Sequence, residues 1–150
     1  NFLPTCSVVL RHGLVRELPD WFTEVWIADY TLHVLHAQHG NLRLLPGLMG
    51  AYRVHSGGVF SAKSTDQRTQ EMLKILNHLD AELGFRYHHL ITSSTNWLQA
   101  VESLRAGDFR RARRFARQRA TGRPLSGHSL RALFLVSSPR LYRSVARSIT

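Results

Sequence analysis

Apolar residues in the first third of the chain occur in short runs rather than at helical spacing. Segment 5–11 contains three consecutive aliphatic residues, which is typical of a strand buried on both faces. Segment 42–54 is apolar on either side of a Pro-Gly pair and predicts two short strands. Between these segments, from Asp29 onward, apolar residues fall three and four positions apart and predict a helix that closes at Gly40. The N-terminal part is therefore predicted to contain a few short strands and one helix.

The spacing becomes regularly helical from about Thr65. One apolar helical face follows Thr65, a second precedes a glycine, and a third begins after Asp108, whose carboxylate suits the N-cap position. Two further helices are expected over 128–136 and 139–148. The chain is therefore predicted to be α+β and mostly helical, with a few short strands followed by a C-terminal array of about four to five helices.

The net charge of +10 belongs entirely to the C-terminal part of the 150-residue chain. Residues 1–60 hold four Arg and four acids, whereas residues 61–150 hold sixteen Lys or Arg against six acids. Eight of the arginines lie in the segment Arg105–Arg123. We therefore expect two domains with different roles, at residues 1–61 and 62–150.

Cysteine content and hydropathy limit the compartment. The single cysteine, Cys6, excludes an internal disulfide and is compatible with the cytosol. No apolar run approaches the ~20 residues of a membrane span, and no signal peptide opens the chain. We expect a cytoplasmic location, with the inner membrane face as the place of any peripheral contact. The chain begins at Asn1 rather than Met, and we expect a processed or partial chain.

Asp29 is the first residue with candidate chemistry. It stands where a loop becomes a helix, so its carboxylate can cap the helix by accepting a backbone N–H. A carboxylate at the start of a helix, flanked by apolar residues, can also be aimed into a cleft and act as a general base. Both interpretations stay open on the residues alone.

A second group of polar residues closes the segment 42–54. Arg53 and His55 precede the pair Gly57-Gly58. A guanidinium, an imidazole and the backbone N–H groups of glycines can converge on phosphate oxygens. The grouping therefore favours an anion site over a simple strand end.

The arginine-rich segment Arg105–Arg123 has two interpretations. Its arginines and apolar residues alternate at helical spacing, so the arginines can form an ordinary solvated face. The same density of positive charge suits an anionic membrane surface or a nucleic acid. No RNA-binding aromatic motif and no zinc-finger spacing accompany it, which argues against nucleic acid.

The order of motifs in the first 61 residues resembles a known family. The segments "TCSVVLR", "LPDWF", "ADY" and "GNLRLLPGLMGAYRVHSGGVFS" follow one another. Together they resemble the C-terminal half of the catalytic domain of family 2 glycosyltransferases, which are inverting enzymes of the GT-A fold. The resemblance implies that Asp29 is the catalytic base. It implies that the donor diphosphate is bound by Arg53, His55 and Gly58. It implies an acceptor side that includes Ser7, Arg11 and Trp21.

The same resemblance implies partners and a cofactor. We expect a nucleotide-sugar donor and a saccharide or lipid-linked acceptor, as in the biosynthesis of cell-surface polysaccharides. A divalent metal ion, manganese or magnesium, is expected in the complete enzyme, with ligands mostly outside this chain. No Asp-x-Asp motif occurs here, so no metal site is predicted in these residues and the isolated chain is expected to be inactive.

The C-terminal part is expected to be a helical extension of that domain. Its segment Arg105–Arg123 offers peripheral contact with a membrane. The alternative hypothesis is a non-catalytic basic helical module that binds an anionic partner, either a membrane surface or a nucleic acid.

Overall fold

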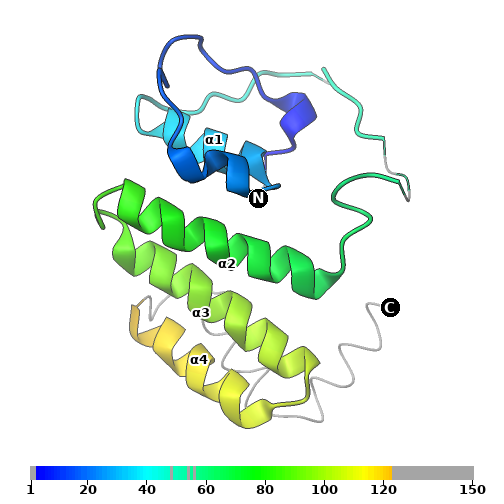
Figure 1. The fold of residues 1–150 in the computed structure, drawn as a ribbon, viewed down its shortest axis with the longest axis vertical. Helices are drawn as coiled ribbons and strands as arrows, with labels where there is room; N and C mark the ends of the chain where they lie inside the picture. Colours follow the sequence, from blue (N-terminus) through cyan, green and yellow to red (C-terminus); the bar gives the residue numbers. More distant parts are fainter. Residues whose placement is uncertain (1–2, 48, 54, 56, 123–150) are drawn as a thin grey trace. The chain divides into compact units, whose positions relative to one another are not determined.

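The computed structural model describes residues 3–47, 49–53, 55 and 57–122. Within them lie two 3-10 helices, η1 (Thr5–Ser7) and η2 (Asp20–Glu24), and four α-helices, α1 (Ala28–Ala37), α2 (Thr65–Glu82), α3 (His88–Arg105) and α4 (Phe109–Gly122) (Figure 1). No β-strand occurs among these residues, so the described fold is all-α. The predicted α+β fold, with the few short strands of a GT-A remnant, is wrong.

In the two segments predicted as strands, the described residues form a 3-10 turn and irregular chain instead. In segment 5–11 the first residues form η1, and Val9 is 91% exposed. In segment 42–54 Leu44 is 93% exposed. A strand is stable only when a neighbouring strand takes up its backbone N–H and C=O groups, and the described residues supply no such neighbour. The apolar runs were therefore not sufficient to predict strands.

The helices predicted from Asp29 and from about Thr65 are confirmed as α1 and α2. The predicted end of the first helix at Gly40 is wrong, because α1 ends at Ala37 with Gln38 at its C-cap position. α2 begins with a capping box, in which the Ser64 N–H donates to Gln67 Oε1 at 2.9 Å and the Gln67 N–H donates to Ser64 Oγ at 3.1 Å. Gly84, at φ +57°, terminates the helix. Each end of α2 therefore follows from residues within a few positions of it.

α3 and α4 form a helical hairpin and lie side by side (Figure 1). Gly107, at φ +76°, ends α3, and the Asp108 N–H donates to the Ser103 carbonyl at 2.8 Å. Asp108 Oδ1 accepts the N–H of Arg111 at 2.9 Å, which confirms Asp108 as the N-cap of α4.

The chain forms two compact units, Asn1–Leu79 and Asp80–Thr150. The core of the first unit joins the loop before α1, α1 itself and α2, through the buried residues Val25, Ile27, Leu35, Ile75 and Leu79. In the second unit a smaller core is formed by Leu104, Ala112 and Ala116, with Trp97 and Phe109 packed against them.

Some predictions reach past the described part of the chain. The helices expected over 128–136 and 139–148 lie outside the described residues. The division into functional domains at 1–61 and 62–150 stays a prediction. None of the described helices has the length and apolar content needed to cross a membrane.

Candidate functional site

Asp29 lies in the first turn of α1, where a negative charge is favoured by the helix dipole. The N-cap position is Ile27, which makes no side-chain capping hydrogen bond, so the interpretation of Asp29 as the cap is wrong. Instead, the half-buried carboxylate of Asp29 accepts a hydrogen bond at Oδ2 from the hydroxyl of Thr5. Val25 and Ile27 are buried in the core just before this turn, so they fix the path of the chain where it enters α1.

The Thr5 bond brings the predicted acceptor segment to the predicted base. Thr5 and Ser7 belong to the single turn η1, although Ser7 directs its own hydroxyl to the Pro4 carbonyl at 2.8 Å. Ser7 and Arg11 are both exposed. The turn therefore reaches Asp29 through Thr5 and not through the two residues predicted from the sequence.

A third segment approaches the same turn at Gly50. A Cβ atom added to Gly50 would lie 2.7 Å from the carbonyl oxygen of Cys6, a distance that real Cβ atoms essentially never show. Only glycine permits this approach of the two backbones. Residues 5–7, 29 and 50 are separated by long stretches of sequence, and the contacts of Thr5 with Asp29 and of Cys6 with Gly50 join them.

The predicted diphosphate-binding residues lie on the chain that leaves Gly50. Arg53 and His55 are exposed. A tight turn follows, in which the Gly58 N–H donates to the His55 carbonyl at 3.2 Å. A Cβ on Gly58 would lie 3.1 Å from Ser61 Oγ, so the turn is compact at that point. Within the described part of the chain, no hydrogen bond or ion pair joins Arg53 or His55 to Asp29.

Trp21, predicted on the acceptor side, is a packing residue in the structure. Its ring stacks on His78 of α2, with centroids 4.7 Å apart and planes 7° from parallel. It also packs against the core of the first unit. Stacking of this kind holds η2 against α2. An acceptor role for Trp21 stays a prediction.

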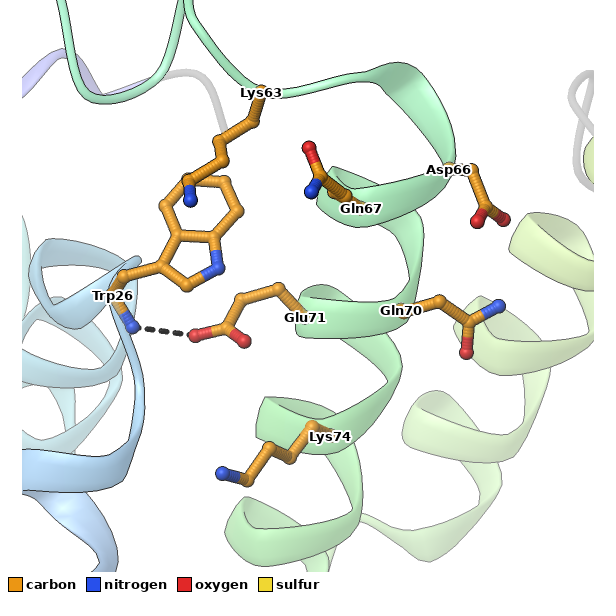
Figure 2. A pocket seen from close by; sticks show the side chains of 7 residues that line it. All are labelled: Trp26, Lys63, Asp66, Gln67, Gln70, Glu71 and Lys74. Atoms are coloured by element: carbon orange, nitrogen blue, oxygen red, sulfur yellow. Dashed lines mark hydrogen bonds between the residues drawn. The ribbon is translucent and has the colours of Figure 1, made fainter.

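The structure also contains a pocket that the sequence patterns did not predict. It has a volume of about 300 Å³ and lies beside Trp26, with Lys63 at its rim (Figure 2). The remaining lining comes from α2 through Asp66, Gln67, Gln70, Glu71 and Lys74. A signal for it was present in the sequence, because Glu71 stands four and eight positions before the core residues Ile75 and Leu79. An acid on the apolar stripe of a helix is unusual and marks a position with a specific partner.

The partner of Glu71 is the backbone of the loop that leads to α1. Glu71 is only 9% exposed, and its Oε1 accepts the N–H of Trp26 at 2.5 Å (Figure 2). This bond compensates part of the cost of burying a carboxylate. It also fixes Trp26 only three residues before Asp29.

The described residues do not fit a metal centre. Among them, no group of three or more His, Cys, Asp or Glu side chains is arranged to hold an ion. The divalent metal expected from the resemblance therefore finds no ligand set in this part of the chain, and no step of the proposed reaction is assigned to it.

Comparisons with known proteins find a short match to uncharacterized proteins. No protein-family model matches the chain, and no solved structure matches it. The chain is similar to uncharacterized proteins of Mycobacterium bovis and Mycobacterium tuberculosis, with 38% identity over 68 residues. The match covers 45% of this chain and 19% of each relative. The chain thus spans about a fifth of the length of the curated relatives it matches.

Proposed function

We propose that this chain contributes the acceptor side of a glycosyl transfer reaction, with Asp29 as the general base. In an inverting transfer, the carboxylate takes the proton of an acceptor hydroxyl while the hydroxyl oxygen bonds to the anomeric carbon of the donor sugar. The bond from that carbon to the diphosphate oxygen breaks, and the diphosphate leaves with the electron pair. Asp29 carries the proton at the end of the step.

The observation that carries the proposal is the hydrogen bond from the Thr5 hydroxyl to Asp29 Oδ2. A general base must lie within hydrogen-bond reach of the proton it removes. Asp29 already holds one hydroxyl at one carboxylate oxygen, and a sugar hydroxyl has the same donor chemistry. The approach of Gly50 to Cys6 gives further support, because it gathers three segments named by the resemblance.

The donor side of the proposal rests on Arg53, His55 and Gly58. The first two are exposed cationic or ionisable side chains on one short stretch, next to a compact glycine turn. A leaving diphosphate is stabilised by donors and cations of this kind. Their role is to receive the negative charge that develops as the diphosphate departs.

The test is Asp29→Asn in the natural protein that contains this sequence. Asn keeps the size of the side chain and still accepts from Thr5, but it cannot take the proton. We expect the transfer rate, measured as nucleoside diphosphate released in the presence of acceptor, to fall about 100-fold or more while the fold is unchanged.

The matched control is Asp20→Asn, which removes the same charge from an exposed acid in η2. Full activity in that control and loss of activity in Asp29→Asn would support the proposal. Near-normal turnover of Asp29→Asn would show that Asp29 is not the base and only contributes a favourable charge to the first turn of α1.

A second candidate function concerns α4 and is favoured by its exposed arginines. As predicted from the spacing, Ala112 and Ala116 are fully buried, whereas most of the arginines are exposed. Arg110, Arg114 and Arg117 form one such exposed stripe. Arg119 differs, since it donates to the Ser93 carbonyl at 3.0 Å and its guanidinium carbon lies 5.1 Å from the centroid of the Trp97 ring.

Such a stripe suits an anionic lipid surface, where each basic residue contributes ~1 kcal/mol of attraction. Sedimentation with anionic and neutral vesicles at low and high salt tests this function. Binding to anionic vesicles alone, lost at high salt and lost when the three stripe arginines are changed to Gln, would support it. Absence of binding to either vesicle would leave the arginines as a solvated face.

A further inference from the structure

The pocket beside Trp26 takes no part in the proposed proton transfer, yet its lining has a defined chemistry. We propose that it binds one or two uncharged sugar rings of the acceptor. The assignment of the ligand as an acceptor rests on the proposed function, whereas binding of a neutral saccharide does not depend on Asp29 being a base. Three features of the pocket carry the inference: its aromatic wall, its mixed polar lining and its fixed position next to α1.

The aromatic wall is the half-buried indole of Trp26. Phe60 packs against it at a centroid distance of 6.1 Å, and Lys63 Nζ lies 5.9 Å from its centroid. An indole offers a large apolar surface with a partly negative face. The C–H groups on one face of a pyranose ring are apolar and slightly positive, and they pack well on such a surface.

The polar lining is suited to hydroxyl groups rather than to a net charge. Asp66 and Glu71 bring negative charge, while Lys63 and Lys74 bring positive charge. Lys74 is already paired with Glu24, at 3.3 Å from Oε2, and donates to the Glu24 carbonyl at 3.0 Å. An anionic ligand would meet the two carboxylates, and a cationic ligand would meet the two lysines.

A hydroxyl group suits both signs, because it donates to carboxylates and accepts from ammonium groups. Gln70 lines the exposed edge of the pocket and places its amide, a donor and an acceptor, on the side of α2 away from Trp26 (Figure 2). Sugar rings carry several hydroxyls around an apolar ring face. They therefore fit the indole and the polar rim at the same time.

The size of the pocket limits the ligand. Its volume of about 300 Å³ is at the lower end of the ~300–1,000 Å³ range of small-molecule sites. That volume holds one or two sugar rings and leaves the rest of a longer saccharide outside. A pocket of this kind recognises the end of a chain or a single unit within it.

The position of the pocket is fixed by Glu71. Its bond to the Trp26 N–H ties the aromatic wall to α2 (Figure 2). Because Trp26 precedes Asp29 by three residues, the wall and the proposed base belong to one short piece of chain. An acceptor held at Trp26 is therefore bound next to the segment that carries the base.

The test uses the 150-residue chain with labelled tryptophan side chains. The indole N–H resonance of Trp26 is assigned with Trp26→Phe, which keeps the backbone N–H that Glu71 accepts. The probes are the methyl glycosides of glucose, galactose and mannose, with glucuronate as the anionic comparison and glucosamine as the cationic one. We expect at least one neutral glycoside to move this resonance in a saturable way and the two charged sugars to bind less well.

A matched pair of variants on α2 tests the site itself. Gln70→Ala removes an exposed amide from the pocket rim, and Asn77→Ala removes an exposed amide from α2 outside the pocket. We expect Gln70→Ala to weaken binding up to about tenfold, the effect of one lost hydrogen bond, and Asn77→Ala to leave Kd unchanged. An unmoved Trp26 resonance, equal losses in both variants or a preference for a charged sugar would each overturn the inference.

Failure of the inference and failure of the proposed function give different results. Asp29→Asn should bind the glycoside as wild type does. If the natural protein binds the glycoside but catalyses no transfer, only the proposed function fails. If the natural protein transfers sugar and Gln70→Ala leaves its acceptor KM unchanged, only the inference about the pocket fails.

Discussion

The two compact units differ in where their apolar residues lie. In the second unit, the helical hairpin buries small side chains, with Ala100, Ala112 and Ala116 almost fully inaccessible. Among the described residues of this unit, the exposed large apolar side chain is Phe85, which lies in the turn before α3. The first unit exposes many more, namely Val9, Leu18, Leu42, Leu44, Leu45, Met49, Tyr52, Val59 and Phe60. The hairpin therefore covers its large apolar side chains within two consecutive helices, whereas the first unit leaves many of its large apolar side chains exposed.

The sharpest test of this contrast is an enlarged side chain in the hairpin. Ala112 is 0% exposed and belongs to its core, so Ala112→Leu should force the two helices apart and cost about 1–3 kcal/mol. The control is Arg114→Leu, which places the same leucine at an exposed position of α4 and should change stability by no more than about 0.5 kcal/mol. Urea unfolding measures both. Equal stability of the two variants would mean that the hairpin is loosely packed.

The first unit is tested by a pair of glycines. A Cβ at Gly50 meets the Cys6 carbonyl at 2.7 Å, whereas a Cβ at Gly40 meets nothing within 4 Å. Gly40→Ala should stabilise the chain by about 0.4–1 kcal/mol, because it restricts the unfolded state. Gly50→Ala loses that gain and must also move one backbone, so it should be less stable than Gly40→Ala by about 1–2 kcal/mol.

Thermal unfolding of both glycine variants measures this difference. The same Gly50→Ala change should lower transfer activity in the natural protein, since it separates the segment of Arg53 from the turn that contacts Asp29. Two alanine variants of equal stability and activity would show that the approach of Gly50 to Cys6 is not required.

A smaller effect is expected from the cap of α4. Asp108→Ala removes the acceptor of the Arg111 N–H and should cost about 1 kcal/mol. Asp108→Asn keeps an acceptor at the same place and should restore most of that stability. Urea unfolding that separates the two variants would confirm the capping role, and identical curves would remove it.

Local signals explain what the sequence predicted well. The carboxylate of Asp108, the glycine at 107 and the apolar spacing of α3 and α4 act over a few residues, so the hairpin and its cap follow from them. The same holds for the position of Asp29 at the start of α1. The capping box of Ser64 and Gln67 acts over the same range, although the apolar spacing alone did not predict it.

Contacts between residues far apart in the chain explain what the sequence did not predict. The run at residues 8–10 has the composition of a buried strand, but a strand requires a neighbour that composition does not reveal. The bond from Thr5 to Asp29 joins residues 24 positions apart, and the bond from Glu71 to Trp26 joins residues 45 apart. For the candidate site, the sequence therefore indicated Asp29 and the order of the segments around it. It indicated neither the contact of Thr5 with Asp29 nor the pocket beside Trp26.

The smallest expected effect is a pH dependence from Tyr30 of α1, in the first unit. Burial raises the pKa of the Tyr30 phenol above 10.0, because the phenolate is poorly solvated there. The stability that Tyr30 contributes is therefore fully present below the unfolded pKa of about 10 and is lost as pH rises through the higher folded pKa. Tyr30→Phe cannot ionise and should lose less stability over this range. Tyr52→Phe is the control, since it removes the same hydroxyl from a side chain that is 61% exposed. Unfolding curves at a series of pH values around 10 measure all three proteins, and a parallel loss of stability in wild type and Tyr30→Phe would show that burial in the first unit does not resist ionisation.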